Sequence, residues 1–112
     1  MYELINRYIA SNETYEIRFA VVMLLNYYIV DDYIDDMLNL LNRGDWMEYY
    51  VQMAVAWAIC MCYVAYPEKT LNFLSRTKLD RFTYNKALQK MVESKQLTIT
   101  QKQFIKTLKR TE

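Results

Sequence analysis

The sequence predicts an all-α protein built from tandem pairs of helices, and three observations lead to this fold class. The chain has 112 residues, which suits a single domain covering 1–112. More than half of its residues are apolar, so the chain can offset the entropy of ordering. One glycine and one proline are too few for the many turns of a sheet domain, and apolar residues recur at helical spacing.

The first three expected helices lie before the single glycine. A short first helix is predicted by a stripe of four apolar residues, namely Leu4, Ile5, Tyr8 and Ile9. This helix ends near Ser11-Asn12, and either of these two residues can cap the next helix. The second helix is expected over 13–29. Asp31-Asp32 are expected at the start of a third helix, where acidic side chains favour the positive end of the helix dipole.

Four more helices are expected after Gly44, making about seven. Gly44 is placed at a left-handed helix end, and Asp45 is read as the next N-cap. The fourth helix is expected over about 46–66, apolar nearly all round. Pro67 opens a fifth that runs through residue 75, and a sixth covers roughly 82–94. Thr98 with Gln101 predicts a capping box for a seventh helix through residue 110.

Self-comparison of the chain indicates repeats. The run 15–21 aligns with 49–55 at an offset of 34, and a weaker third copy begins at Thr83. A fixed offset with a long helix followed by a shorter one is typical of a helical solenoid. We therefore expect a HEAT-like helical repeat solenoid, an α-α superhelix with repeats at roughly 1–43, 44–78 and 79–112. The two long helices should lie roughly parallel.

Charge is distributed unevenly along the chain. Residues 1–75 hold four Lys/Arg against ten Asp/Glu, a balance of −6, whereas 76–112 hold ten against three, a balance of +7. Such an asymmetry indicates a polyanionic partner. The alternative is a C-terminal surface that is simply solvated. Arg81, Lys86 and Lys90 could form a row that follows a phosphate backbone. The basic surface continues over Lys102, Lys106, Lys109 and Arg110.

The remaining polar and sulfur-bearing residues indicate no metal site and no cofactor. Cys60 and Cys62 point apart on a helix and are read as reduced, buried residues. Asp31, Asp32, Asp35 and Asp36 are read as solvated acids at a helix start, although a carboxylate cluster also permits a metal. The tyrosine pairs 27–28 and 49–50 are expected to pack between helices.

Three runs resemble a known family. Tyr15-Glu16-Ile17-Arg18-Phe19-Ala20, Tyr49-Tyr50-Val51-Gln52-Met53-Ala54-Val55-Ala56-Trp57-Ala58 and Phe82-Thr83-Tyr84-Asn85-Lys86-Ala87 are similar to the DNA alkylation repair proteins of the AlkD type. The resemblance covers nearly all of this chain and the C-terminal half of the family's usual length. It implies a HEAT-like solenoid whose concave face grips duplex DNA.

The resemblance also implies site residues. Active members of the family are monofunctional glycosylases that release alkylated purines with an aspartate, two tryptophans and a nearby arginine. Arg18 matches the arginine and Trp57 the second tryptophan, whereas the aspartate and first tryptophan belong to helices before Met1. Base release by this chain alone is therefore not expected. From the residues alone, Trp57 could instead pack in the core, and Arg18 could form an ion pair with an acid such as Glu16.

Two other functions stay open. One is a non-catalytic helical-repeat module that binds a protein. The other is a piece that depends on an N-terminal partner segment or on a homodimer, in which the apolar edge formed by the first stripe is covered. No transmembrane segment, signal peptide or membrane partner is expected, and we predict a cytoplasmic protein.

Overall fold

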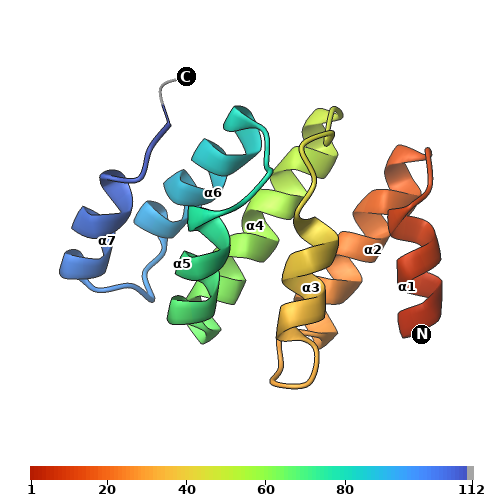
Figure 1. Cartoon of the computed structure of the whole chain (residues 1–112), viewed down its shortest axis with the longest axis horizontal. Coiled ribbons are helices and arrows are strands. Elements are labelled where there is room, and N and C mark those ends of the chain that lie inside the picture. The colour runs from red at the N-terminus through yellow and green to blue at the C-terminus, as the bar shows by residue number, and fades with distance from the viewer. Residues whose placement is uncertain (111–112) are drawn as a thin grey trace.

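The described part of the chain, residues 1–110, forms seven α-helices and no strand in a computed structural model (Figure 1). In chain order they are α1 (Tyr2–Ile9), α2 (Thr14–Tyr27), α3 (Ile34–Leu41), α4 (Tyr49–Ala65), α5 (Pro67–Ser75), α6 (Arg81–Glu93) and α7 (Ile99–Lys106). The all-α class and the number of helices were predicted, and both are confirmed within these residues. The last two residues of the third expected repeat lie outside the described residues.

Helices α2, α4 and α6 lie side by side at the centre of the molecule. α4 packs against both α2 and α6, and α2 and α4 run in the same direction (Figure 1). α3 and α5 contact each other and pack on one side of α4. α1 packs on α2 and α7 on α6, so these two short helices form the ends of the molecule.

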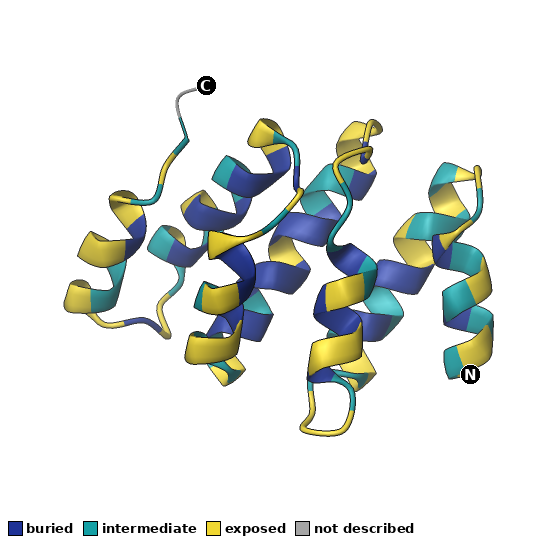
Figure 2. Ribbon diagram, in the orientation of Figure 1, coloured by how far each residue is buried: buried dark blue, intermediate teal, exposed yellow. Residues whose placement is uncertain are grey.

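α4 is the most deeply buried helix (Figure 2). Val55 and Ile59 are fully buried, and Ala56 and Ala58 are small residues with no exposed surface. Small side chains allow neighbouring helices to approach closely, and this suits a helix that contacts α2, α3, α5 and α6. Cys60 and Cys62 are free and buried on this helix, as expected.

Contacts between successive helix pairs join residues about 34 positions apart. Arg43 donates to the carbonyl of Ile9 at 3.0 Å, and the Lys69 ammonium lies 3.1 Å from the Asp35 carboxylate. Asn42 Oδ1 accepts from the Thr77 hydroxyl at 2.9 Å and from the Lys78 amide at 2.7 Å. The sequence separations in these contacts are 34 to 36 residues.

The segment 42–48 differs from the prediction. α4 begins at Tyr49 with Glu48 as its N-cap, so neither a start at Trp46 nor an Asp45 cap is correct. Trp46 is buried in the loop, where its indole donates to the Leu41 carbonyl at 3.0 Å. Arg43 lies over the indole ring at 4.3 Å and pairs with Asp45 at 2.9 Å. These contacts hold the segment outside the helix.

The expected left-handed conformation at Gly44 is wrong, because no residue of the described chain has a positive φ. A Cβ at this position would lie 2.7 Å from the Lys78 carbonyl oxygen. Glycine is therefore needed here for a close backbone approach.

Other element boundaries also shift. The N-cap residue of α2 is Glu13 and not Ser11 or Asn12, although the Ser11 hydroxyl accepts from the Glu13 amide. Asp31 and Asp32 lie in a turn before α3, whose first turn holds the other two acids.

The C-terminal end of α7 is also shorter than expected. α7 ends at Lys106 because the following segment turns back over α6. There Asn85 pairs with both the amide and the carbonyl of Arg110. The predicted capping box of Thr98 and Gln101 is confirmed at the start of the same helix.

The N-terminal edge is less apolar than expected. Ile5 and Ile9 are buried within the chain itself, against α2, and only Leu4 and Tyr8 remain partly exposed. Two of the four residues expected to be covered by a second copy are therefore already covered. Among residues 1–110, no helix is long and apolar enough to cross a membrane.

Candidate nucleic-acid interface

The three central helices share one solvent-exposed side, which we call the open face. On α4 the accessible stripe is Tyr50, Met53, Trp57 and Met61, at spacings of three and four that place the residues on one side of a helix. The opposite side of α4 is buried under α3 and α5. We assign to the same face accessible residues of the two neighbouring helices, namely Tyr15, Arg18 and Phe19 on α2 and Phe82, Lys86 and Lys90 on α6.

Trp57 is 51% exposed at the middle of the open face. The alternative that it packs in the core is therefore wrong. The indole ring projects from a helix whose neighbouring positions, Ala56 and Ala58, are fully buried. A large exposed ring at the centre of a helical layer can stack on a planar group or lie against a cation.

Arg18 is exposed on α2, and the expectation that it pairs with Glu16 is wrong. Glu16 accepts a hydrogen bond from the Ser11 hydroxyl instead. No ion pair in the described part of the chain includes Arg18. Its guanidinium therefore remains available for an anionic partner, with five donors in a planar fork.

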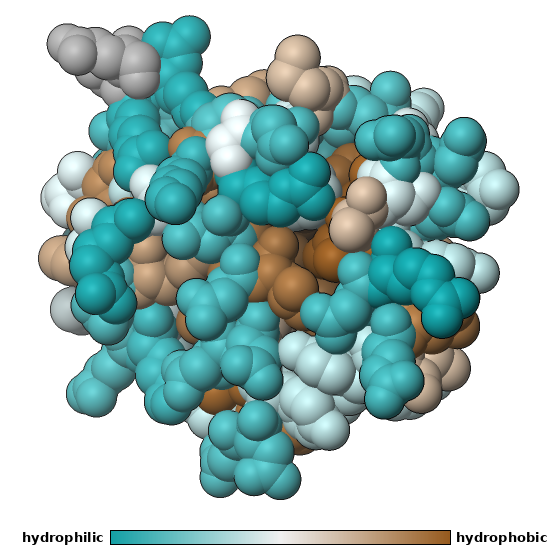
Figure 3. Space-filling model, turned by 45° about the vertical axis from the view of Figure 1, so that its right-hand side comes forward, coloured by the Kyte–Doolittle hydropathy of each residue, from teal (hydrophilic) through white to brown (hydrophobic). Residues whose placement is uncertain are grey.

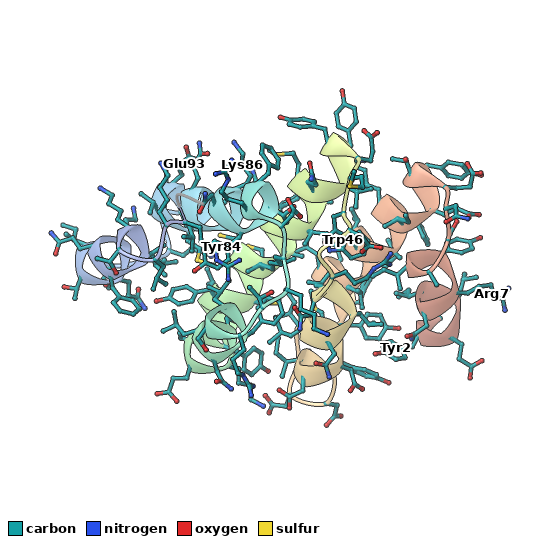
Figure 4. All side chains as sticks on the ribbon, turned by 45° about the horizontal axis from the view of Figure 1, so that its top comes forward. Tyr2, Arg7, Trp46, Tyr84, Lys86 and Glu93 are labelled. Carbon is teal, nitrogen blue, oxygen red and sulfur yellow. The ribbon has the colours of Figure 1, made fainter. Side chains whose placement is uncertain are left out.

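The two lysines of α6 have different surroundings. The Lys86 ammonium lies 5.5 Å from the centroid of the Phe82 ring and donates to Gln89 Oε1 at 3.0 Å. Figure 4 shows Lys86 and Glu93 along one edge of α6. Lys90 is half-buried. Burial raises the pKa of the Cys60 thiol, and the positive charge of Lys90 acts on that pKa in the opposite direction, so the ammonium lies near α4. The two lysines thus lie at neighbouring parts of the open face.

A groove of about 770 Å³ separates α6 from α7. We call it the α6–α7 groove. Arg81, Lys86 and Lys106 line it as expected of one basic surface, and Lys109 joins them. Lys102 is half-buried on α7 and does not line the groove. The sequence places Lys109 on the continuing basic surface as part of a helix through residue 110, whereas the chain leaves α7 after Lys106 and returns toward α6.

Arg110 has a structural role. Its guanidinium lies 3.9 Å from the centroid of the Tyr84 ring and donates to the Leu79 carbonyl at 3.3 Å. The Tyr84 hydroxyl in turn donates to the Leu108 carbonyl at 3.0 Å. Arg110 therefore anchors the C-terminal segment against α6.

Exposed aromatic residues stand near the N-terminal ends of all three central helices. Tyr15, Tyr50 and Phe82 are 71%, 63% and 42% exposed. Tyr49 links two of them, with ring centroids 5.5 Å from Tyr50 and 6.0 Å from Phe82. The expectation of packing between helices is wrong for Tyr50 and for Tyr27, which is 66% exposed, whereas Tyr49 of α4 does contact Phe82 of α6. Tyr15, Tyr49 and Phe82 stand at matching positions of the repeats, and these aromatic residues were the signal that could have revealed this row.

The four acids at the start of α3 lie on a different part of the molecule, namely Asp31, Asp32, Asp35 and Asp36. Asp35 pairs with Lys69, and Asp31 accepts a hydrogen bond from the Tyr66 hydroxyl, which raises the pKa of Tyr66. Within residues 1–110, no group of three or more His, Cys, Asp or Glu side chains could hold a metal ion. A second groove, of about 500 Å³, lies between α3 and α5. Figure 3 shows the face that is seen when the α1 end is turned forward, and hydrophilic side chains surround apolar surface on this face.

The open face thus combines exposed rings with cations from α2 and α6, whereas the α6–α7 groove gathers cations around an apolar floor. Both features could contact an anionic macromolecule, because long cationic side chains reach phosphates and carboxylates alike. No family model, no curated protein and no solved structure matches this chain.

Proposed function

We propose that this chain is a HEAT-like helical-repeat module that binds duplex DNA through the open face. The observation that carries the proposal is the exposure of Arg18 without an ion pair, in the same helical layer as the exposed Trp57 and the lysines of α6. The resemblance to the DNA alkylation repair proteins of the AlkD type points to the same two residues. A duplex presents the dense row of phosphates that such cations bind.

The repeat architecture is supported by the contacts between successive helix pairs. Hydrogen bonds and an ion pair join residues separated by 34 to 36 positions, close to the offset of 34 between the matching sequence runs. In a solenoid each repeat contacts only its neighbours, so contacts that recur at a separation near the sequence offset agree with a repeat of about that length. The side-by-side packing of α2, α4 and α6 agrees with this arrangement.

The side chains of the open face suit backbone contacts more than recognition of a sequence. Arg18, Lys86 and Lys90 can neutralise phosphates, and contacts of this type are independent of base sequence and sensitive to salt. Trp57 offers a ring for an exposed or cationic base, which an undamaged duplex does not present. Binding should therefore be weak and non-specific, with a Kd on the order of 10⁻⁴–10⁻⁶ M at physiological salt.

The test is a salt titration by fluorescence anisotropy with a labelled duplex of arbitrary sequence. Lys86→Glu/Lys90→Glu should nearly abolish binding. The double variant Arg7→Glu/Lys95→Glu makes the same change in net charge at exposed positions outside the open face, and it should bind as the parent does. Arg18→Glu is a second test at an exposed position, in case reversal of the half-buried Lys90 disturbs folding. Binding that is absent at low salt, or equally weakened in both double variants, would remove the DNA proposal.

A protein-interaction module is the second candidate, and the aromatic row of the open face favours it. Exposed tyrosine and tryptophan side chains are enriched where proteins bind proteins. Tyr15 and Tyr50 lie on this row without a described covering group. If DNA binding fails, Tyr50→Ala should weaken association with the partner protein, whereas under the DNA proposal it should change duplex binding little.

A further inference from the structure

We propose that the α6–α7 groove binds an acidic amphipathic helix of a partner protein. The groove has a volume of about 770 Å³ and runs beside α6, a helix of 13 residues. A helix of that length extends roughly 20 Å, enough for about three turns of a second helix to lie alongside it. The size and shape thus permit a helix to dock in the groove.

The floor of the groove is apolar. Phe82, Leu88 and Val92 from α6 and Ile105 from α7 line it. Leu88 is 4% exposed and Ile105 is fully buried, so Phe82 and Val92 carry most of the accessible apolar surface. Bases of nucleic acids bind by stacking on rings, and among the described residues that line the groove only Phe82 has one. The Lys86 ammonium already lies 5.5 Å from the centroid of that ring. Leucine and isoleucine side chains spaced three and four residues apart on a partner helix would instead bury their surface here. The floor therefore favours a peptide over a nucleic acid.

The rim of the groove is basic on both sides. Arg81 and Lys86 line it from α6, and Lys106 and Lys109 from the α7 side. Two acids, Asp80 and Glu93, also line it, so the formal charge of the lining residues is +2. Asp80 Oδ2 is engaged, because it accepts from the Thr83 amide at 3.0 Å as part of the helix cap. The cations outnumber the acids, and a partner with carboxylates beside its apolar stripe complements them.

The structure of α7 allows the groove to adjust to such a partner. α7 is only eight residues long and packs on α6 at the end of the molecule. Its exposed outer residues include Ile99 and Phe104, and Ile105 is its single buried residue. A short end helix with few buried contacts can shift slightly to accommodate side chains between itself and α6.

This site overlaps the proposed DNA surface only at Phe82 and Lys86 of α6. Arg18 and Trp57 do not line the α6–α7 groove, and Val92 and Ile105 do not belong to the open face. Substitutions at Val92 and Arg18 therefore separate the two proposals.

The experiment uses the full chain and a fluorescein-labelled 14-residue peptide of leucine and glutamate. One peptide has leucines at helical spacing, and a scrambled peptide of the same composition has no apolar stripe. We expect anisotropy to show binding of the patterned peptide at least tenfold tighter than of the scrambled one, because only the former presents one apolar side to the groove. Equal binding of the two peptides would overturn the proposal.

Variants locate the site. Val92→Glu should weaken the patterned peptide tenfold or more, because a carboxylate is placed among apolar side chains, and Val92→Ala should weaken it less without disturbing the fold. Lys106→Glu/Lys109→Glu should also weaken it, whereas Arg7→Glu/Lys95→Glu and Arg18→Glu should not. Unchanged affinity in Val92→Glu and Val92→Ala would overturn the proposal. The proposal would also be overturned if single-stranded DNA displaced the peptide and the binding of that DNA were itself weakened by substitution of Val92. This result would identify a nucleic acid as the occupant.

Discussion

Neighbouring residues of α4 have opposite surroundings, and this determines what each can do. Ile59 has no exposed surface, whereas Trp57, two positions earlier, is 51% exposed. The indole of Trp46, by contrast, is buried and hydrogen-bonded to the Leu41 carbonyl (Figure 4). Of the two tryptophans, one therefore stabilises the fold and the other is available to a ligand.

Substitution of these α4 residues tests the assignment. Ile59→Ala should lower the free energy of unfolding by about 2–5 kcal/mol, because it removes buried methyl groups and leaves a cavity. Trp57→Ala should change it by less than about 1 kcal/mol, since the ring is half solvated. Urea denaturation measures both. A loss for Trp57→Ala as large as that for Ile59→Ala would mean that the indole is a core residue.

Cys62 makes stability depend on alkaline pH. Burial raises the pKa of its thiol from 9.0 to about 12. The folded state therefore retains a proton that the unfolded state loses, so the contribution to stability is complete below pH 9 and declines as the pH rises toward 12. Tyr63 shifts in the same direction, so the comparison must be made with Cys62→Ala. Denaturation at pH 8 and pH 10.5 should show a smaller pH-dependent loss in the variant, and equal losses would contradict the assignment.

At the scale of elements, the caps of the helices differ in strength. α1, α2, α3 and α5 have no side-chain cap, whereas α6 is capped by Asp80 and α7 by a complete capping box. Asp80 Oδ2 also accepts from the side-chain amide of Gln52 at 3.3 Å, and this hydrogen bond links the start of α6 to α4. α7 has a strong cap but few buried residues, and its stability depends accordingly on local interactions.

Removal of the α7 cap should therefore have a local effect. Thr98→Ala eliminates the hydroxyl that accepts from the Gln101 amide at 3.1 Å, and it should cost about 1 kcal/mol. Hydrogen exchange should accelerate over 99–106 and remain unchanged in α4. Thr100→Ala is the control, because this exposed residue of the same helix makes no described side-chain hydrogen bond. Uniform acceleration across all helices would show that α7 unfolds only with the whole molecule.

At the scale of the whole molecule, the loops that follow α3 and α5 lie against each other. Asn42 binds Thr77 and Lys78 across this junction, and Gly44 allows the backbones to approach. The molecule measures 38 × 31 × 23 Å, with a radius of gyration of 13.2 Å. Successive helix pairs are thus joined at their ends as well as through the α2, α4 and α6 layer.

Gly44→Ala tests the importance of this junction. The new Cβ would lie 2.7 Å from the Lys78 carbonyl oxygen, so one of the two loops must move. Overpacking against backbone should lower the free energy of unfolding by about 1–3 kcal/mol. Asn39→Ala, at an exposed position of α3, should have an effect within about 0.5 kcal/mol. Equal stability of the two variants in urea would show that the junction is flexible.

The sequence by itself determined the class and order of the elements. Apolar periodicity predicted seven helices, Pro67 and Thr98 marked the starts of α5 and α7 correctly, and the burial of both cysteines followed from an apolar helix. These features depend on local spacing and capping chemistry, which the chain encodes within a few residues.

Tertiary structure decided the features that depend on distant residues. Trp46 stayed out of α4 because Arg43 and the Leu41 carbonyl hold its ring, and Gly44 was required by Lys78, 34 positions away. Only the packing of α3 and α5 on one side of α4 left Trp57 exposed on the other. Exposure is a property of the assembled layers. A helix that is apolar on every side has no sequence pattern to mark its exposed side, and its neighbours decide which sides are buried.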